Sequence, residues 1–417
     1  MENKKSSVPK LRFPGFTGAW EQRKLGEVAT RVTRKNKNLE STLPLTISAQ
    51  LGLVDQISYF DKRIASSNLT NYILLKRGEF AYNKSYSNGY PFGAVKRLNN
   101  YASGVIPSLY IAFFPNNKTV NSNFMETYFE TNLWHKEVST RATEGARNHG
   151  LLNISPTDFM DINIRIPMIM KEQVEITKFL HNVDTLITLH QRKLEHLKEQ
   201  KKGLLQKMFP KNGEVVPEVR FPGFTDDWEQ RKLSELIQKG GSGGTPKSTN
   251  KAYYNGNIPF LGISDISKSN GYIDDTEKYI SEKGLDNSSA WIVPKGAISL
   301  AMYASVGKLA ILNTDAATSQ AFYNMVFEDV SIRDYIYHRL GKANEFGEWT
   351  RLISTGTQSN LNADKVKNFK IQIPQIIDEI KNISTFFNQL DSLIALHQRK
   401  LEHLKLMKKG LLQQMFV

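Results

Sequence analysis

Several short polar segments of the chain carry side chains that could hydrogen-bond to nucleic acid. Arg and Lys can pair with guanine edges, Asn and Gln with adenine edges, and small hydroxyl side chains donate to phosphate. The candidate residues in the first half are Arg31, Arg34, Lys35, Lys37, Tyr82, Asn83, Lys84, Tyr86, Asn88, Tyr90, Arg141, Arg147, Asn148 and His149. The candidates in the second half are Thr245, Lys247, Tyr253, Tyr303, Ser305, Lys308, Thr357, Gln358, Ser359 and Asn360. Each segment alone is also typical of an ordinary surface turn, so only the whole set favours nucleic-acid binding.

These segments alternate with runs that predict strands and helices. Period-two patterns rich in Ile, Val, Tyr and Phe, broken by Gly, Pro and Asn, predict strands within 41–60, 72–115, 258–263, 291–300 and 308–313. Helices are expected at 122–138 and 331–349. The basic run 31–37 and the glycine-rich run 240–244 are expected to be loops. Each half should therefore hold an α+β domain that presents the candidate residues on its loops.

The chain contains the same frame twice. Arg-Phe-Pro-Gly-Phe-Thr begins at Arg12 and again at Arg220, and Trp-Glu-Gln-Arg-Lys-Leu begins at Trp20 and again at Trp228. The ten residues of 189–198 recur letter for letter at 396–405. The intervening stretches, about 26–165 and 234–372, show little likeness to each other. The pattern indicates one duplicated scaffold that holds two differently specified modules.

The closing part of each copy predicts a long helix with a heptad stripe. The first stripe is Ile176, Leu180, Val183, Ile187, His190, Leu194, Leu197, Lys201, Leu204 and Met208, and the second lies 207 residues further on. About 38 residues at 1.5 Å each give a helix of roughly 57 Å. The obvious partner for each stripe is the other stripe, in an antiparallel pair, although each helix could instead pair with a different protein.

Polar residues interrupt these stripes and cover the outer helix faces. His190 and His397 could be ligands, but a polar stripe position that fixes the register explains them better. Gly203 and Gly410 would allow a close backbone approach. The cations proposed to bind partner subunits or DNA phosphate, rather than only solvent, are Arg192, Lys193, Lys198, Arg399, Lys400 and Lys405.

Composition limits the classes of function. The net charge is +14, with 30 basic and 18 acidic residues in 1–210 against 25 and 23 in the remainder, which favours a polyanionic partner, although a basic protein without one is the plain alternative. The absence of cysteine excludes disulfides, Cys-ligated metals and thiol catalysis and fits a cytoplasmic protein. Neither a signal peptide nor a membrane-spanning run is evident.

Motifs of catalysis are missing. The glycine run places Pro246 before Lys247 and so fails as a phosphate-binding loop, and no zinc, nucleophile-elbow or dinucleotide motif occurs. A scattered nuclease site around Asp275, Glu277 and Lys278 is a weak alternative. The open hypotheses are a non-catalytic DNA-reading subunit, an enzyme that acts alone, and a coiled-coil adaptor that never touches DNA.

The duplicated opening and the duplicated Leu-His-Gln-Arg-Lys-Leu-Glu-His-Leu-Lys helix resemble the specificity subunit of type I restriction–modification systems. The resemblance covers the whole chain, and Phe260 to Ile266 also resembles the start of a target-recognition domain of that family. It implies two α/β target-recognition domains in tandem, each followed by a long helix, with the helices in an antiparallel coiled coil of pseudo-two-fold symmetry. The implied segments are recognition domains at 1–168 and 219–374, spacer helices at 171–209 and 376–417, and a linker at 210–218.

The resemblance also implies partners. A chain of this family reads a bipartite, asymmetric sequence in double-stranded DNA and joins two methyltransferase (M) subunits and two restriction (R) subunits, without catalysis of its own. S-adenosylmethionine, ATP and Mg2+ would then belong to the partner subunits, and this chain would bind none of them.

Overall fold

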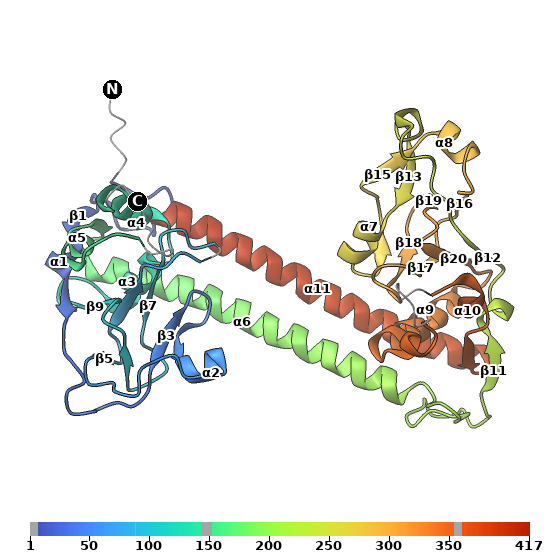
Figure 1. Cartoon of the computed structure of the whole chain (residues 1–417), viewed down its shortest axis with the longest axis horizontal. Coiled ribbons are helices and arrows are strands. Elements are labelled where there is room, and N and C mark those ends of the chain that lie inside the picture. The colour runs from blue at the N-terminus through green and yellow to red at the C-terminus, as the bar shows by residue number, and fades with distance from the viewer. Residues whose placement is uncertain (1–6, 88, 143–151, 354–360) are drawn as a thin grey trace. The chain divides into compact units, whose positions relative to one another are not determined.

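The computed structural model describes residues 7–87, 89–142, 152–353 and 361–417 of the chain, which forms two compact units. The first unit combines residues 1–189 with 401–417, and the second holds residues 190–400. Two long helices, α6 (Met170–Lys207) and α11 (Ile377–Met415), each contribute to both units (Figure 1). Each unit is therefore built from segments of both sequence copies.

The first unit is a mixed α/β domain with a four-stranded sheet of order β2-β9-β6-β7. Its elements are β1 (Glu21–Lys24), α1 (Leu25–Val28), β2 (Ala29–Val32), β3 (Leu45–Ser48), β4 (Gly52–Asp55), α2 (Gln56–Phe60), β5 (Ile73–Lys76), β6 (Phe80–Asn83), β7 (Ala94–Arg97), β8 (Ser103–Ile106), β9 (Ile111–Pro115), α3 (Ser122–Tyr128), α4 (Leu133–Arg141), α5 (Pro156–Met160) and β10 (Asn163–Ile166). The pairs β3-β4 and β5-β8 form smaller antiparallel ladders. One large apolar core joins the sheet to α3, α4, α5 and the start of α6.

The second unit has a different sheet arrangement, with a five-stranded sheet of order β12-β20-β17-β18-β14 and a four-stranded sheet of order β15-β13-β19-β16. Its elements are β11 (Glu229–Lys232), η2 (Leu233–Glu235), β12 (Lys239–Ser242), η3 (Lys251–Tyr253), β13 (Ile258–Leu261), α7 (Ile263–Lys268), β14 (Tyr272–Ile273), β15 (Lys278–Ile280), α8 (Glu282–Asp286), β16 (Ile292–Val293), β17 (Ile298–Ala301), β18 (Leu309–Leu312), β19 (Ala316–Thr318), β20 (Phe322–Val326), α9 (Val330–Glu345), η4 (Glu348–Arg351), α10 (Ala363–Lys367) and β21 (Lys370–Ile373). Helix α9 packs into the main core of this unit through Tyr335, Ile336 and Leu340.

The two units share the repeated frame despite their unlike sheets. In the first unit β1 pairs antiparallel with β10, with Glu21 opposite Ile166, and in the second β11 pairs with β21, with Glu229 opposite Ile373. The residue after each ladder strand donates its backbone N–H to the segment before the second strand, from Leu25 to the carbonyl of Ile162 and from Leu233 to that of Phe369. The common sequence thus folds into a common platform.

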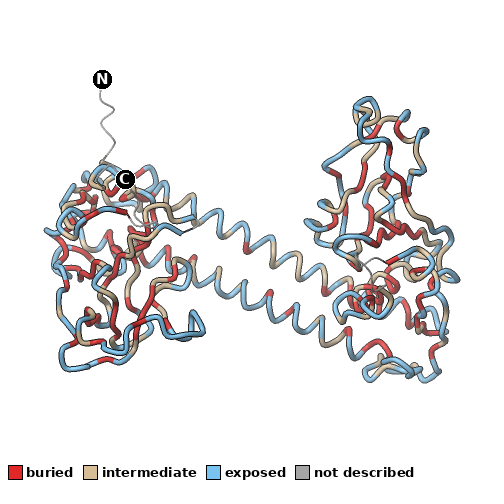
Figure 2. Tube along the Cα trace, viewed as in Figure 1, coloured by how far each residue is buried: buried red, intermediate tan, exposed pale blue. Residues whose placement is uncertain are grey.

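The long helices confirm the heptad prediction. In Figure 2, buried turns alternate with exposed ones along both helices, and every residue of the two predicted stripes is buried or half-buried. Within the second unit His190 meets His397 and Lys201 meets Asp391, so the two helices run antiparallel there. Within the first unit Lys408 meets Asp184, with the same antiparallel order.

Each long helix ends in the core of the unit that belongs to the other sequence copy. Phe416, just after α11, lies in the first core against Trp20, with ring centroids 5.9 Å apart. Phe209, just after α6, lies in the second core against Trp228 at 6.5 Å. The repeated Met-Phe ending is therefore a core element contributed in exchange.

Several local expectations are wrong in a common way. Arg31 lies in strand β2 rather than in a loop, and Gly240 and Gly241 lie in strand β12, paired with β20. The expected helix 122–138 is interrupted between α3 and α4, and the expected strand 291–300 is two short strands, β16 and β17. Polar and glycine residues take strand geometry here because neighbouring strands supply hydrogen bonds, which the local sequence does not reveal.

The expectation for the two helix glycines is also wrong. A methyl group placed on Gly203 or Gly410 would meet no atom within 4 Å, so no close backbone approach requires them. The structure gives no other reason for their presence.

Candidate nucleic-acid interface

A buried three-residue clasp fixes each long helix to its own frame. The Glu172 carboxylate, in the first turn of α6, accepts from Arg12 Nε at 2.7 Å and Nη2 at 2.8 Å and from Trp20 Nε1 at 3.1 Å. Its side chain is 1% exposed. Because a buried carboxylate needs its partners to offset desolvation, this geometry holds the helix start in one position relative to the opening motif.

The second copy repeats the clasp with equivalent residues. Glu379, in the first turn of α11, accepts from Arg220 Nε at 2.6 Å and from Trp228 Nε1 at 3.3 Å. The hydrogen bond to Glu379 raises the pKa of Arg220, so the guanidinium stays charged. The Arg and Trp residues common to both openings therefore position the long helices.

The helix pair carries a matching set of polar contacts in each unit. Lys201 Nζ lies 2.5 Å from Asp391 Oδ1 in the second unit. The equivalent Lys408 lies 2.9 Å from Asp184 Oδ2 in the first unit and also 2.7 Å from Glu130 Oε2. Although burial opposes it, the two carboxylates raise the pKa of Lys408. Both lysines are thus already paired with protein carboxylates.

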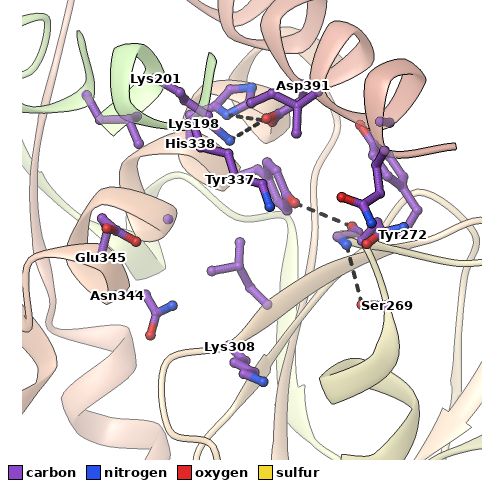
Figure 3. Close-up of a pocket in the computed structure, with 18 of the residues that line it drawn as sticks. Lys198, Lys201, Ser269, Tyr272, Lys308, Tyr337, His338, Asn344, Glu345 and Asp391 are labelled. Carbon is purple, nitrogen blue, oxygen red and sulfur yellow. Dashed lines mark hydrogen bonds and ion pairs between the residues drawn. The ribbon is translucent and has the colours of Figure 1, made fainter. Parts of the chain in front are cut away.

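A cleft of about 820 Å³ lies in the second unit between the long helices, α9 and the segment from α7 to β14. Figure 3 shows Lys198, Lys201 and Asp391 on one side of it and Lys308 on the other. Its lining includes five cationic side chains and three carboxylates, so its net charge is positive. The cations are Lys198, Lys201, Lys202, Lys308 and Arg399.

His338 closes this cleft on the α9 side as a neutral group. Asn388 donates its amide N–H to Asp334, so its oxygen faces His338 Nε2 at 2.8 Å and that nitrogen carries the proton. Burial lowers the pKa of His338 to about 4. Nδ1 is then an unprotonated acceptor with no hydrogen-bond partner among the described residues, 3.8 Å from Asp391 Oδ2.

A second cleft, of about 490 Å³, lies in the first unit between the long helices, α4 and β7. Its lining includes the cations Lys96, Lys405, Lys408 and Lys409 against one carboxylate, Glu130. Burial lowers the pKa of Lys96. With four cations against one carboxylate, the positive excess is larger here than in the second unit, which has five cations against three carboxylates.

The same helix positions line both clefts. Lys198, Lys201, Lys202, Leu205 and Ile394 in the second unit correspond, at an offset of 207, to Lys405, Lys408, Lys409, Leu412 and Ile187 in the first. A third cleft, of about 560 Å³, opens beside α3 in the first unit and contrasts in charge. It has two cations, Arg97 and Lys178, and three carboxylates.

The predicted residues of the first unit divide between exposed and structurally engaged positions. Arg31 and Lys37 are exposed. Arg34 Nη2 donates to both carboxylate oxygens of Glu79, and Lys35 Nζ donates to the carbonyl of Asn71 at 2.8 Å. The structure does not bring this basic run to either cleft.

The segment from Ala81 to Tyr90 is brought partly to the cleft of the first unit. Tyr86 is 53% exposed and Tyr90 lines the cleft, whereas Lys84 Nζ donates to the carbonyl of Ile154. Asn83 accepts from the backbone of Ser85. The expectation for Tyr82 is corrected, because strand β6 turns its side chain into the core, where it is 0% exposed.

Arg141 ends α4 and pairs with Glu137 at 2.7 Å and with Asp161 at 3.8 Å. Asn88, Arg147, Asn148 and His149 lie outside the described residues, as do Thr357, Gln358, Ser359 and Asn360. The predictions for these eight residues stay predictions.

In the second unit, the loop after β17 reaches the cleft. Lys308 lines the cleft, Ser305 lies 3.3 Å from Ser267, which also lines it, and Tyr303 is 37% exposed. Thr245, Lys247 and Tyr253 lie elsewhere, and Thr245 Oγ1 donates to Gln320. Of the predicted loops of this unit that the structure describes, the loop after β17 alone lines the cleft.

The predicted partner-binding cations divide between positions that line the clefts and exposed positions outside them. Lys198 and Arg399 line the cleft of the second unit and Lys405 that of the first, while Arg192, Lys193 and Lys400 are exposed outside both. The sequence interpretation missed Lys96 in the cleft of the first unit. It also missed exposed leucines beside the stripes. Their apolar character at positions next to the heptad stripe is a signal that the sequence contains. These leucines are Leu186, Leu189, Leu393 and Leu396.

No helix among the described residues is long and apolar enough to cross a membrane. No group of three or more His, Asp or Glu side chains in the described part of the chain is arranged to hold a metal ion.

A repeated frame that carries two unlike sheets and two long helices defines a tandem protein of the type I restriction–modification class. The chain belongs to the family of the type I restriction modification DNA specificity domain, which it matches over residues 18–199 and again over residues 225–406. The family match thus covers both copies of the frame.

Individual relatives agree with this assignment. The chain is 30% identical over 193 residues to the type I restriction enzyme MjaIX specificity subunit of Methanocaldococcus jannaschii, covering 46% of this chain and 44% of that one. It is 26% identical over 170 residues to the EcoR124I/EcoR124II specificity subunit of Escherichia coli, covering 40% and 41%. The matches span less than half the length of these two relatives. A match at 22% identity to the MjaVIII specificity subunit of M. jannaschii covers 74% and 72%.

Solved structures share the fold. The S subunit of a type I restriction–modification system from M. genitalium superposes with a TM-score of 0.60 at 15% identity, over 98% of this chain and 99% of that one. A chain from a structure of the assembly of a type I restriction–modification system gives 0.57 at 15% identity, over 98% and 99%.

Proposed function

We propose that this chain is the DNA-reading specificity subunit of a type I restriction–modification complex and has no catalytic activity of its own. The observation that carries the proposal is the identical frame, clasp for clasp, around two different sheet arrangements. A shared frame suits partners that bind both halves alike, and unlike modules suit unlike DNA targets. The proposed recognition domains are residues 1–168 and 219–374, the proposed spacer helices are 171–209 and 376–417, and the linker is 210–218.

The proposed target is bipartite and asymmetric double-stranded DNA. Each domain would read one half-site through base edges and hold the duplex through phosphate contacts. The helices α6, of 38 residues, and α11, of 39, would set the gap between the half-sites. Helix-turn-helix dimers place their half-site centres about 34–36 Å apart, one helical turn, and we expect a similar spacing here.

The proposed partners are two methyltransferase subunits and two restriction subunits, acting with this chain in the cytoplasm. The outer helix faces offer exposed leucines next to exposed cations, which suits a helical protein partner. The leucines are Leu186, Leu189, Leu393 and Leu396, and the cations are Arg192, Lys193 and Lys400. S-adenosylmethionine, ATP and Mg2+ would act on the partner subunits.

Sequencing of methylated bases in cells that carry this chain with its methyltransferase subunits tests the proposal. The expected result is one bipartite motif with a fixed gap. Exchange of residues 26–165 for those of a related chain should change one half-site only, and insertion of seven residues before Leu194 should change the gap only. Methylation without sequence preference, or an insertion that alters the bases, would refute the proposal.

Incubation of the purified chain alone with DNA and Mg2+ separates this proposal from that of an independent enzyme. We expect neither cleavage nor methylation. Binding of the assembled complex to cognate and random duplexes over a salt series separates it from a coiled-coil adaptor. A reading subunit shows steep salt dependence and a preference for the cognate duplex, and an adaptor shows neither.

A further inference from the structure

We propose that Lys198 and Lys405, equivalent residues of the two long helices, bind DNA backbone phosphates at the two clefts. This inference deepens the proposed function and depends on it. It decides, for two of the exposed helix cations, between the two partners left open by the sequence, in favour of DNA phosphate. It also makes the long helices part of the DNA contact rather than only a spacer.

The first argument is that the helices present the same residues to both clefts. Lys198, Lys202 and Leu205 line the cleft of the second unit, and their equivalents Lys405, Lys409 and Leu412 line that of the first. The opposite walls differ completely, since one is built from α9 and the segment before β14 and the other from α4 and β7. If both clefts bind DNA, they share the part of it whose chemistry does not vary with sequence, which is the phosphate backbone.

The second argument is that segments predicted to read bases reach both clefts. Tyr90 lines the cleft of the first unit, and Lys308 lines that of the second. Both segments were singled out for their mixture of hydrogen-bonding and aromatic side chains. The helix lysines therefore lie beside the residues that would contact bases, where phosphate contacts fix the register of a reader on the duplex.

The third argument is the state of the lysines themselves. Lys201 and Lys408 are neutralised within the helix pair, by Asp391 and by Asp184 with Glu130. Lys198 and Lys405 are exposed and form no ion pair with any residue that the structure describes. A lysine whose charge is not already compensated releases a counterion when it meets phosphate, and it adds to affinity for that reason.

Charge also distinguishes these clefts from the third one. The cleft beside α3 has more carboxylates than cations and would repel a phosphate backbone. The two clefts that contain the repeated lysines have the opposite balance. The positive character is thus local to the places where helix and predicted reading segments meet.

The test is the salt dependence of DNA binding by the complex of this chain with its methyltransferase subunits. The double variant Lys198→Ala, Lys405→Ala is compared with the wild type on a labelled cognate duplex from 0.05 to about 0.3 M salt. Each lost phosphate contact lowers the slope of log K against log salt by about 0.9, so the slope should fall by about 1.8. If the lines converge near 1 M, affinity at 0.1 M falls about 60-fold.

The matched control is the double variant Lys178→Ala, Lys370→Ala, which removes the same charge from exposed positions outside the two positive clefts. It should keep the wild-type slope. The variant Lys198→Arg, Lys405→Arg should restore the slope, because a guanidinium also binds phosphate. The ratio of cognate to scrambled affinity should stay unchanged in all variants, since phosphate contacts carry no sequence information.

Three outcomes would overturn the inference. The alanine variant could keep the wild-type slope, it could lose discrimination between duplexes, or it could fail to assemble with the methyltransferase subunits in the absence of DNA. The last outcome would assign the lysines to protein docking. A wild-type complex without any sequence preference is a separate result, which refutes the proposed function itself.

Discussion

His190 and His397, the equivalent residues of the two sequence copies, meet with their Nδ1 atoms 2.9 Å apart. At this distance one ring must donate a proton and the other accept it. Residues that are identical in sequence therefore differ in whether Nδ1 carries a proton. This hydrogen bond can form only while at least one of the two rings is neutral.

This pair predicts acid sensitivity of the helix contact. Burial lowers the pKa of His397, assisted by His190, Lys400 and Lys193. The folded protein thus binds fewer protons than the unfolded chain near the ordinary histidine pKa of about 6.5, so this contribution is present above that pH and is lost as the pH falls below it. We expect the midpoint temperature of thermal unfolding to decrease as the pH is lowered from 7.5 to 5.

The variant His190→Asn, His397→Asn isolates this contribution from that of the carboxylates. Two amides can form a hydrogen bond at every pH in this range. Thermal denaturation should show a smaller drop on acidification than in the wild type. Parallel curves for the two proteins would contradict the prediction.

The buried clasps predict large and local losses of stability. Glu172→Ala leaves the Arg12 guanidinium and the Trp20 N–H without their acceptor, and removal of one partner of a buried ion pair costs about 3–5 kcal/mol. Hydrogen exchange of the first unit should accelerate, and that of the second should not. Asp161→Ala, which removes an exposed contact to Lys24, serves as the control and should leave exchange nearly unchanged.

The exchanged aromatic residues predict a crossed pattern of damage. Phe416→Ala should destabilise the first unit and Phe209→Ala the second, by about 3–5 kcal/mol each, because both rings are buried in those cores. Hydrogen exchange resolved by peptide measures the two units separately. The opposite result, with Phe416→Ala destabilising only the second unit and Phe209→Ala only the first, would contradict the exchange of these rings between the two sequence copies.

The repeated contacts also predict that half of the chain can assemble with itself. Residues 1–212 contain Asp184, Lys201 and Phe209, which are the equivalents of Asp391, Lys408 and Phe416. Two such fragments can form each contact once from either side, so light scattering should report a dimer. Lys201→Asp in the fragment places two carboxylates together and should shift the mass toward the monomer.

Much of the frame was predictable because it depends on periodicity and repetition. The stripes from Ile176 and Ile383 follow a 3.5-residue period, and burial along α6 and α11 follows it. The identical letters in two places required a common structure. Neither inference needs knowledge of which distant residues meet.

The clefts and clasps were not predictable for the opposite reason. Glu172 is one of seven acidic residues in 151–200, and nothing local marks it as the partner of Arg12, 160 residues away. Tyr82 was expected at the surface from its polar neighbours, but strand pairing of β6 with β7 and β9 determines which way it points. Lys198 and Lys193 are both exposed lysines of α6, and only the fold of the second unit shows that Lys198 lines a cleft and Lys193 does not.

The place of Phe416 has a consequence for synthesis. The first unit lacks part of its core until Phe416 leaves the ribosome, 207 residues after Phe209. At roughly 5–20 residues per second, that delay is about 10–40 s. The core of the first unit therefore stays incomplete while the second unit is being made, and the two cores are completed nearly together.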